Sequence, residues 1–105
     1  MIKNFMPKKG DQISFIITFT TDVNFDSVEM GVKKEYTDED FVLLKTLGNG
    51  ITRIDGRRFQ VIITSQETNN LEFLSYIYDI RTRSGSTIKT PLSGKIIVKE
   101  SVFNG

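Results

Sequence analysis

The sequence predicts an all-β domain, built as a sandwich of seven to eight short antiparallel strands. Residues that suit strands dominate, because Ile, Val, Thr, Phe and Tyr together account for 42 of the 105 residues. The chain contains no Ala, the residue with the highest helix propensity. Apolar segments recur about every ten residues between turn residues, which is typical of a sandwich. We expect one domain over residues 1–105, with an arm at residues 1–8 and a tail at residues 100–105.

Three strands are expected in the N-terminal half. Residues 12–20 alternate between apolar and polar side chains, which is the period of a strand with one buried face. The second segment alternates in the same way, and the third is apolar and ends at a Gly-Asn-Gly turn. These three strands are predicted at residues 12–20, 28–33 and 41–47.

A β-hairpin is predicted around the pair Asp55-Gly56, because Asp-Gly favours the positive φ angles of a two-residue turn. With a loop of two residues, Arg53 would lie opposite Arg58 on the neighbouring strand, with Arg57 beside them. Opposed like charges disfavour pairing by roughly a few tenths of a kcal/mol. Two interpretations remain open for this arginine cluster: contact with an acidic partner, or an exposed surface whose charge nearby acidic residues compensate.

The C-terminal half continues the pattern. Polar residues 65–71 suit a loop or one short helical turn, and residues 72–82 suit a long strand. Two further segments, residues 87–90 and 92–99, are separated by Pro91, which indicates an edge, a bend or a bulge. A buried Tyr hydroxyl needs a hydrogen-bond partner, and a backbone carbonyl near residues 65–71 could supply it. The core residues expected along the strands are Phe15, Phe19, Phe59, Val61, Tyr76, Tyr78, Ile80 and Ile96.

Paired apolar residues break the alternation on four strands. Where two apolar residues are adjacent, one faces the core and the other faces outward. A contiguous outward patch would mark a protein interface. The candidate interface residues are therefore Ile16, Ile62, Ile77 and Ile97, together with Arg53, Arg57 and Arg58. Replacing Ile16 and Ile62 with Lys is expected to leave the domain folded and to abolish assembly.

Composition excludes several functions. The chain has no Cys and no His, which removes disulfides, thiolate or imidazole metal sites and the Ser-His-Asp triad. Composition leaves catalysis by Asp, Glu, Lys or Tyr open, but no nucleophile and base stand at a recognisable spacing. We expect no enzyme activity, no catalytic residues, no cofactor and no bound metal. Asp38, Glu39 and Asp40 are consecutive, so their side chains diverge and suit calcium poorly. A net charge of +1 gives no general attraction to nucleic acid or to an anionic membrane, and the apolar runs are too short to span a bilayer.

Several fragments, taken in order, carry a family resemblance. The strand Tyr76-Ile77-Tyr78-Asp79-Ile80 and the ending Ser93-Gly94-Lys95-Ile96-Ile97-Val98 are its best parts. Together with the Lys9-Gly10-Asp11 sequence and the central hairpin, they resemble the small immunoglobulin-like β-sandwich of tailed-phage tail and baseplate proteins. The similarity is greatest to the N-terminal domain of upper-baseplate proteins and to its stand-alone relatives, and it covers about residues 8–102. Relatives usually carry a Gly-containing turn where this chain has residues 21–26.

The resemblance implies a structural component of a phage virion, in the tail or baseplate, that acts through protein–protein contacts. It implies other virion proteins as partners, in a multi-copy assembly, and a location in the virion after synthesis in the bacterial cytoplasm. Neither nucleic acid nor a membrane is expected as a partner. The alternative is a carbohydrate-binding or host-adhesion module, which would need exposed aromatic rings. The candidates for such rings are Phe25, Tyr36, Phe41 and Phe103.

Overall fold

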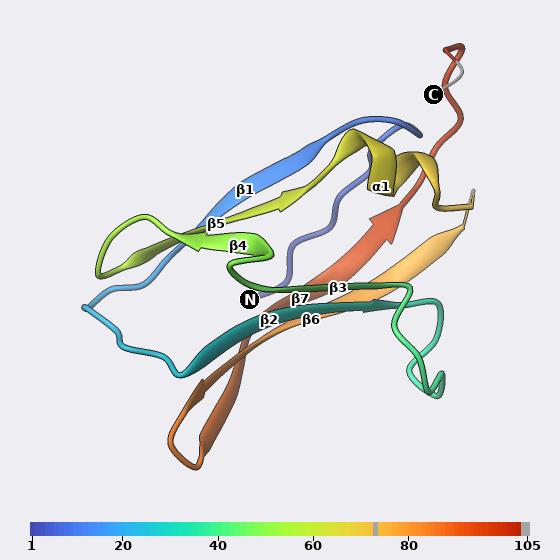
Figure 1. Cartoon of the computed structure of the whole chain (residues 1–105). Coiled ribbons are helices and arrows are strands. Elements are labelled where there is room, and N and C mark those ends of the chain that lie inside the picture. Colours follow the sequence, from blue (N-terminus) through green and yellow to red (C-terminus); the bar gives the residue numbers. More distant parts are fainter. Residues whose placement is uncertain (73, 104–105) are drawn as a thin grey trace.

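The structure, a computed structural model, describes residues 1–72 and 74–103. Within these ranges it contains seven strands and one short helix, in the order in which Figure 1 colours them from blue to red. The prediction of an all-β domain with seven to eight strands is confirmed. The elements are β1 (Ile13–Thr18), β2 (Ser27–Lys33), β3 (Leu43–Leu47), β4 (Gly50–Arg53), β5 (Arg58–Ile63), α1 (Ser65–Asn69), β6 (Ser75–Ser84) and β7 (Thr87–Ile97).

The strands form one curled sheet in the order β1-β5-β4-β3-β2-β6-β7. The half that contains β1, β5 and β4 lies over the half that contains β2, β6 and β7, with β3 leading from one to the other (Figure 1). This is the layout of an immunoglobulin-like sandwich. One detail departs from the expectation of antiparallel pairing throughout, since β3 and β4 pair in parallel over two residues. The chain turns sharply between them at Gly48, whose φ is +86°.

The core lies between the two halves and follows the alternation in the sequence. In β2, Val28, Met30 and Val32 are all fully buried. Seven of the eight expected core residues are buried, and the exception is Phe19. This ring is half-buried because β1 ends one residue earlier, and it packs at the margin of the core against Phe25 and Phe59.

The N-terminal arm is part of the sandwich. It pairs in parallel with β7, and the Phe5 N–H donates to Lys95 O while the Ile97 N–H donates to Phe5 O, both at 2.9 Å. The Phe5 ring lies 4.8 Å from the Phe15 ring and 5.8 Å from the Tyr78 ring, measured between centroids. Residues 1–9 therefore act as an additional, irregular strand that extends the β2-β6-β7 half.

The arm approaches β7 most closely at Gly94. A Cβ atom at this position would lie 2.0 Å from the backbone oxygen of Lys3. The same oxygen accepts a hydrogen bond from the buried hydroxyl of Tyr78. Burial raises the pKa of Tyr78 to about 12, so the hydroxyl remains a donor at neutral pH. Close packing and hydrogen bonding thus fix the arm at one point.

The helix α1 follows β5 directly, and it is the short helical turn that was one of the two alternatives expected for residues 65–71. It begins with a capping box, in which the Thr64 side chain and the Glu67 side chain each bond to the other's backbone N–H. The hydroxyl of Tyr76 accepts from the Glu72 N–H at 2.9 Å. The partner of this tyrosine is therefore an N–H just after the polar segment and not the carbonyl that the sequence suggested. The arrangement resembles the tyrosine corner of immunoglobulin-like domains.

A partly buried ion pair joins α1 to β3. The ammonium of Lys45, a side chain that is 7% exposed, contacts the carboxylate of Glu67. Burial by itself raises the pKa of Glu67, but hydrogen bonds from Lys45 and Thr64 outweigh that effect and leave the pKa below its ordinary value.

The hairpin between β4 and β5 differs from the prediction by one residue. Arg53 lies opposite Phe59, not opposite Arg58. The Asp55 carboxylate accepts from the backbone N–H groups of Arg57 and Arg58, at 2.9 and 3.0 Å. This side-chain turn gives a loop of three residues, and Gly56 is not among the glycines with positive φ.

The expected irregularity at Pro91 is confirmed. The register of β6 and β7 changes from Ile80 opposite Leu92 to Thr82 opposite Lys89, which places Pro91 in a bulge. The two predicted segments on either side of this proline form the single strand β7.

Candidate protein-interaction site

An open groove of about 310 Å³ lies on the outer face of β3, β2 and β6. We call it the outer groove. It forms because the inward residues of β2 and β6 fill the core and the alternate residues face outward. The residues that line it are Glu29, Gly31, Lys33, Tyr36, Phe41, Leu44, Ile77, Tyr78, Asp79, Arg81 and Thr90.

The register of β2 with β6 determines which polar side chains of the groove lie opposite one another. Glu29 lies opposite Arg81, and the two form an ion pair at 3.1 Å. Both side chains are partly exposed, so the pair contributes little to stability and serves mainly to fix the position of the two charged groups. Asp79 lies opposite Gly31, one step further along the same face, and is exposed.

The floor of the groove depends on Gly31. A Cβ atom at this position would lie 2.3 Å from the Phe41 ring, so the ring packs directly on the glycine backbone. Lys33 also contacts the ring, with its ammonium 4.9 Å from the ring centroid. The same ammonium donates to Asp38 O at 2.6 Å, which ties the loop after β2 to the groove.

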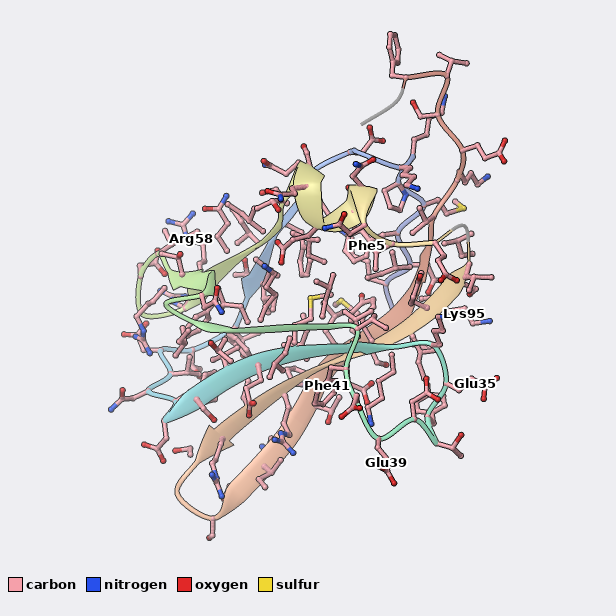
Figure 2. All side chains as sticks on the ribbon, turned by 45° about the vertical axis from the view of Figure 1, so that its right-hand side comes forward. Phe5, Glu35, Glu39, Phe41, Arg58 and Lys95 are labelled. Carbon is pink, nitrogen blue, oxygen red and sulfur yellow. The ribbon has the colours of Figure 1, made fainter. Side chains whose placement is uncertain are left out.

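Three apolar side chains remain exposed around the groove. Tyr36 is 75% exposed, Phe41 49% and Leu44 42%. Figure 2 shows Phe41 below the sheet, beside the loop that carries Glu35 and Glu39. An apolar centre with charged groups at its margin is the composition of a protein-interaction surface.

The four predicted interface isoleucines do not form one patch. Ile16 is 51% exposed, and Ile62, Ile77 and Ile97 are half-buried, so all four have the expected outward orientation. Ile16 and Ile62 lie on adjacent strands β1 and β5, whereas Ile77 and Ile97 lie on β6 and β7. The two pairs therefore occupy opposite outer faces of the sandwich. Only Ile77 lines the outer groove.

The three predicted arginines all have partners within the domain. Arg57 contacts Asp22 at 3.4 Å, and Arg58 contacts Asp55 at 2.7 Å. The bond from Arg58 is the main reason that the pKa of Asp55 is lowered.

Arg53 stacks on the Phe59 ring and donates to Val23 O at 2.6 Å. Acidic residues thus pair with Arg57 and Arg58, whereas the partners of Arg53 are a ring and a carbonyl. Both interpretations of the cluster stay predictions. Arg58 lies on the other side of the molecule from Glu35 (Figure 2).

Of the acidic residues 38–40, Asp38 has a local structural role. The Asp38 carboxylate accepts from the Glu35 N–H at 3.2 Å and closes a turn. Within residues 1–72 and 74–103, no three His, Cys, Asp or Glu side chains come together as a metal site. No helix in the same ranges is long and apolar enough to cross a membrane.

Most of the groove was not foreseen from the sequence. Phe41 and Tyr36 were identified only as exposed aromatic candidates, and Glu29, Gly31 and Arg81 were not singled out. The available signal was the alternation of β2, which places Glu29, Gly31 and Lys33 on its outward face. That this face meets the outward face of β6 follows only from the pairing of the two strands.

No protein-family model matches the chain, and no curated protein matches it. Among solved structures, the chain is similar to the NK cell receptor NKp44, with a TM-score of 0.52 and 13% identity over 94% of this chain and 99% of that one.

The chain is also similar to the extracellular domain of the voltage-gated sodium channel β4 subunit. That match has a TM-score of 0.52 and 11% identity, over 96% of this chain and 93% of that one. The second immunoglobulin domain of the mouse polymeric immunoglobulin receptor matches with a TM-score of 0.47 and 11% identity, over 98% of this chain and 99% of that one. By fold, the chain is an immunoglobulin-like domain.

Proposed function

We propose that this chain is a structural component of a tailed-bacteriophage virion, in the tail or baseplate, and that it acts through protein–protein contacts. The observation that carries the interaction role is the outer groove, where exposed apolar side chains lie beside the ion pair of Glu29 and Arg81. The phage assignment rests on the resemblance of residues 76–80 and 93–98 to tail and baseplate domains. The immunoglobulin-like fold is compatible with it.

Binding at this groove would bury Phe41 and Leu44 under a partner side chain. Removing these apolar side chains from water supplies the favourable free energy. Glu29 and Arg81 are already paired, so they can orient the partner at the margin without leaving an unpaired charge in the interface. The partner is expected to be another virion protein.

The test begins with purified, intact particles from the source of this sequence. A cryo-electron-microscopy map is expected to contain this domain in the tail or baseplate, with a neighbouring chain seated on the outer groove. Particles whose map and protein composition lack the chain would show that it is not a virion component.

A matched pair of variants tests the groove itself. Leu44→Lys places a charge in the groove, and Ile88→Lys makes the same change at a comparably exposed position outside it. We expect Leu44→Lys to be lost from the particles and Ile88→Lys to be incorporated normally. Equal incorporation of both variants would remove the groove from the assembly interface.

A carbohydrate-binding module is the second candidate, and one observation favours it. The rings of Tyr36 and Phe41 are exposed beside the carboxylate of Asp79, which is a suitable combination for a sugar. A glycan array would discriminate the two functions. Binding that Tyr36→Ala abolishes would support the sugar site, and the absence of any bound glycan would leave the virion role as the better account.

A further inference from the structure

The free edge of β1 is a second surface, separate from the outer groove. β1 is the first strand in the sheet order and pairs on one side only, with β5. Phe19, just after β1, donates its N–H to Arg57 O, which places Phe19 and Arg57 in a hydrogen-bonded pair. Hydrogen-bonded pairs recur at every second residue of an antiparallel strand. Ile17, Phe15 and Ile13 therefore also direct their backbone N–H and C=O groups toward β5.

The residues of β1 that lie between these direct their backbone groups away from β5. Ser14, Ile16 and Thr18 point their N–H and C=O groups toward the open edge. Within residues 1–72 and 74–103, no backbone hydrogen bond reaches these groups. All three residues are exposed. The edge is thus a row of free donors and acceptors.

Nothing in β1 discourages another strand from pairing with it. Natural edge strands are usually protected by charged side chains, Pro or a bulge. Residues 12–20 contain no charged residue and no Pro, and the register with β5 is regular. The other end of the sheet differs, because the arm that covers β7 carries Lys3, Pro7 and Lys8. In the part of the chain that the structure describes, the edge of β1 therefore lacks the protection that the arm gives to β7.

We propose that β1 is a self-association edge, which pairs antiparallel with β1 of a second copy of this chain around a twofold axis at Ile16. In this register Ile16 faces Ile16 of the second copy, and Ser14 faces Thr18. Each of these three pairs exchanges two backbone hydrogen bonds, because all the residues involved direct their free groups toward the edge. Hydroxyl pairs and aliphatic pairs are both favourable across strands.

The side chains on the outer face fit the same arrangement. Ser14 lies opposite Ile62 and Ile16 lies opposite Gln60, so Ile16 and Ile62 are diagonal neighbours. The twofold axis would join the two isoleucines of one copy to those of the other in one apolar strip. This accounts for two outward isoleucines that the outer groove does not include.

Hydrogen-bond geometry favours a second copy in the antiparallel direction. Lys8 and Lys9 precede Asp11, and Arg57 and Arg58 pair with Asp22 and Asp55, so neither end of β1 presents a surface of one dominant charge. Antiparallel pairing lets Ser14, Ile16 and Thr18 each exchange two backbone hydrogen bonds with one residue of the second copy, which parallel pairing does not allow. This self-complementary pairing around a twofold axis identifies a second copy as the occupant of the edge.

Sedimentation velocity over a range of protein concentrations tests the proposal. We expect the wild-type chain to form a dimer as the concentration rises and Ile16→Lys to remain a monomer, because two ammonium groups would meet at the twofold axis. Ile88→Lys is the matched control, since the two isoleucines are 51% and 53% exposed. It is expected to dimerise like the wild type. Circular dichroism and thermal melting establish that both variants are folded.

Cross-linking tests the register. The chain has no cysteine, so Ile16→Cys introduces the only thiol. Residues in a hydrogen-bonded antiparallel pair have Cα atoms about 5.5 Å apart, which lies within the range of a disulfide. Oxidation is expected to link Ile16→Cys into covalent dimers and to leave Ile88→Cys largely monomeric.

Three results would overturn the proposal: a wild-type chain that stays monomeric, a dimer that Ile16→Lys leaves intact, or equal cross-linking of the two cysteine variants. A strand from a different protein would then be the remaining occupant of the edge. These outcomes are separate from those for the outer groove, because Leu44→Lys is expected to leave the dimer unchanged.

Discussion

Replacing Gly94 with Ala is expected to push the N-terminal arm off β7. The new methyl group would lie 2.0 Å from Lys3 O, a backbone atom that no side-chain rotation can move away. The φ angle of Gly94 lies outside the positive region, so alanine suits the backbone of β7 itself. The cost therefore comes from the contact with the arm and not from strain in the strand.

The contacts around Gly94 give the magnitude. A displaced arm loses the hydrogen bond from Lys3 N to Ser93 O and the one from Lys95 N to the Asn4 side chain, both at 2.9 Å. It also loses the bond from the Tyr78 hydroxyl to Lys3 O. At about 1 kcal/mol for each net hydrogen bond, the free energy of unfolding is expected to fall by about 3 kcal/mol. For a domain of this size the melting temperature would fall by roughly 10–20 °C.

Urea unfolding of four proteins measures this effect: the wild type, Gly94→Ala, a chain lacking residues 1–7, and the same shortened chain with Gly94→Ala. In the shortened chain the methyl group meets no arm, so the substitution should be nearly neutral there. An equal cost of Gly94→Ala with and without the arm, or a cost below about 0.5 kcal/mol in the full chain, would show that the arm does not clash with the new methyl group.

Three further changes have defined outcomes. Tyr76→Phe removes the acceptor for a backbone N–H and is expected to cost about 1–3 kcal/mol in urea unfolding; an unchanged midpoint would exclude a structural role for the hydroxyl. Because the folded-state pKa of Glu67 is lowered by the bond from Lys45, its stabilisation is complete above the unfolded value near 4.5 and disappears as the pH falls through the folded value. Unfolding measured from pH 7 to pH 3 should therefore show a steeper loss for the wild type than for Glu67→Gln, and parallel curves would contradict the assignment. Gly31→Ala should swing the Phe41 ring away from the groove floor and reduce incorporation into particles, while the melting temperature changes little because a side chain can yield.

Alternation predicted the parts of the fold that depend on burial of one strand face. Val28, Met30 and Val32 were expected to share a face, and all three are fully buried. The same rule gave the correct orientation for Ile16 and Ile77. It could not show that these two residues lie on opposite outer faces, because that depends on which strands share a half of the sandwich.

The rule that an Asp-Gly pair forms a two-residue turn gave the wrong hairpin register, because a side chain in this loop bonds to the backbone. The Asp-Gly pair predicted a two-residue loop, but the Asp55 carboxylate bonds to two backbone N–H groups and lengthens the loop by one residue. That shift moves Arg53 away from Arg58 and onto the Phe59 ring. A hairpin register is therefore sensitive to a single Asp side chain.

The place of the arm was beyond sequence reasoning for a different reason. Residues 1–9 show no alternation, and their partners in β7 lie about ninety residues away along the chain. The sequence offers two signals, the aromatic side chain of Phe5 and the glycine at position 94. Neither residue by itself shows that the arm pairs with β7.

The parallel direction of the arm also has a mechanical consequence. Met1 lies beside Ser93, and Lys8 lies beside Lys99, so the two ends of the chain leave this pair of strands in opposite directions. A force that pulls the ends apart therefore acts along the strands and loads the hydrogen bonds between the arm and β7 in shear. Bonds loaded in this way must break together, whereas bonds in a hairpin pulled from its open end break one after another. We therefore expect tension between Met1 and Lys99 to be resisted until the hydrogen bonds between the arm and β7 break together.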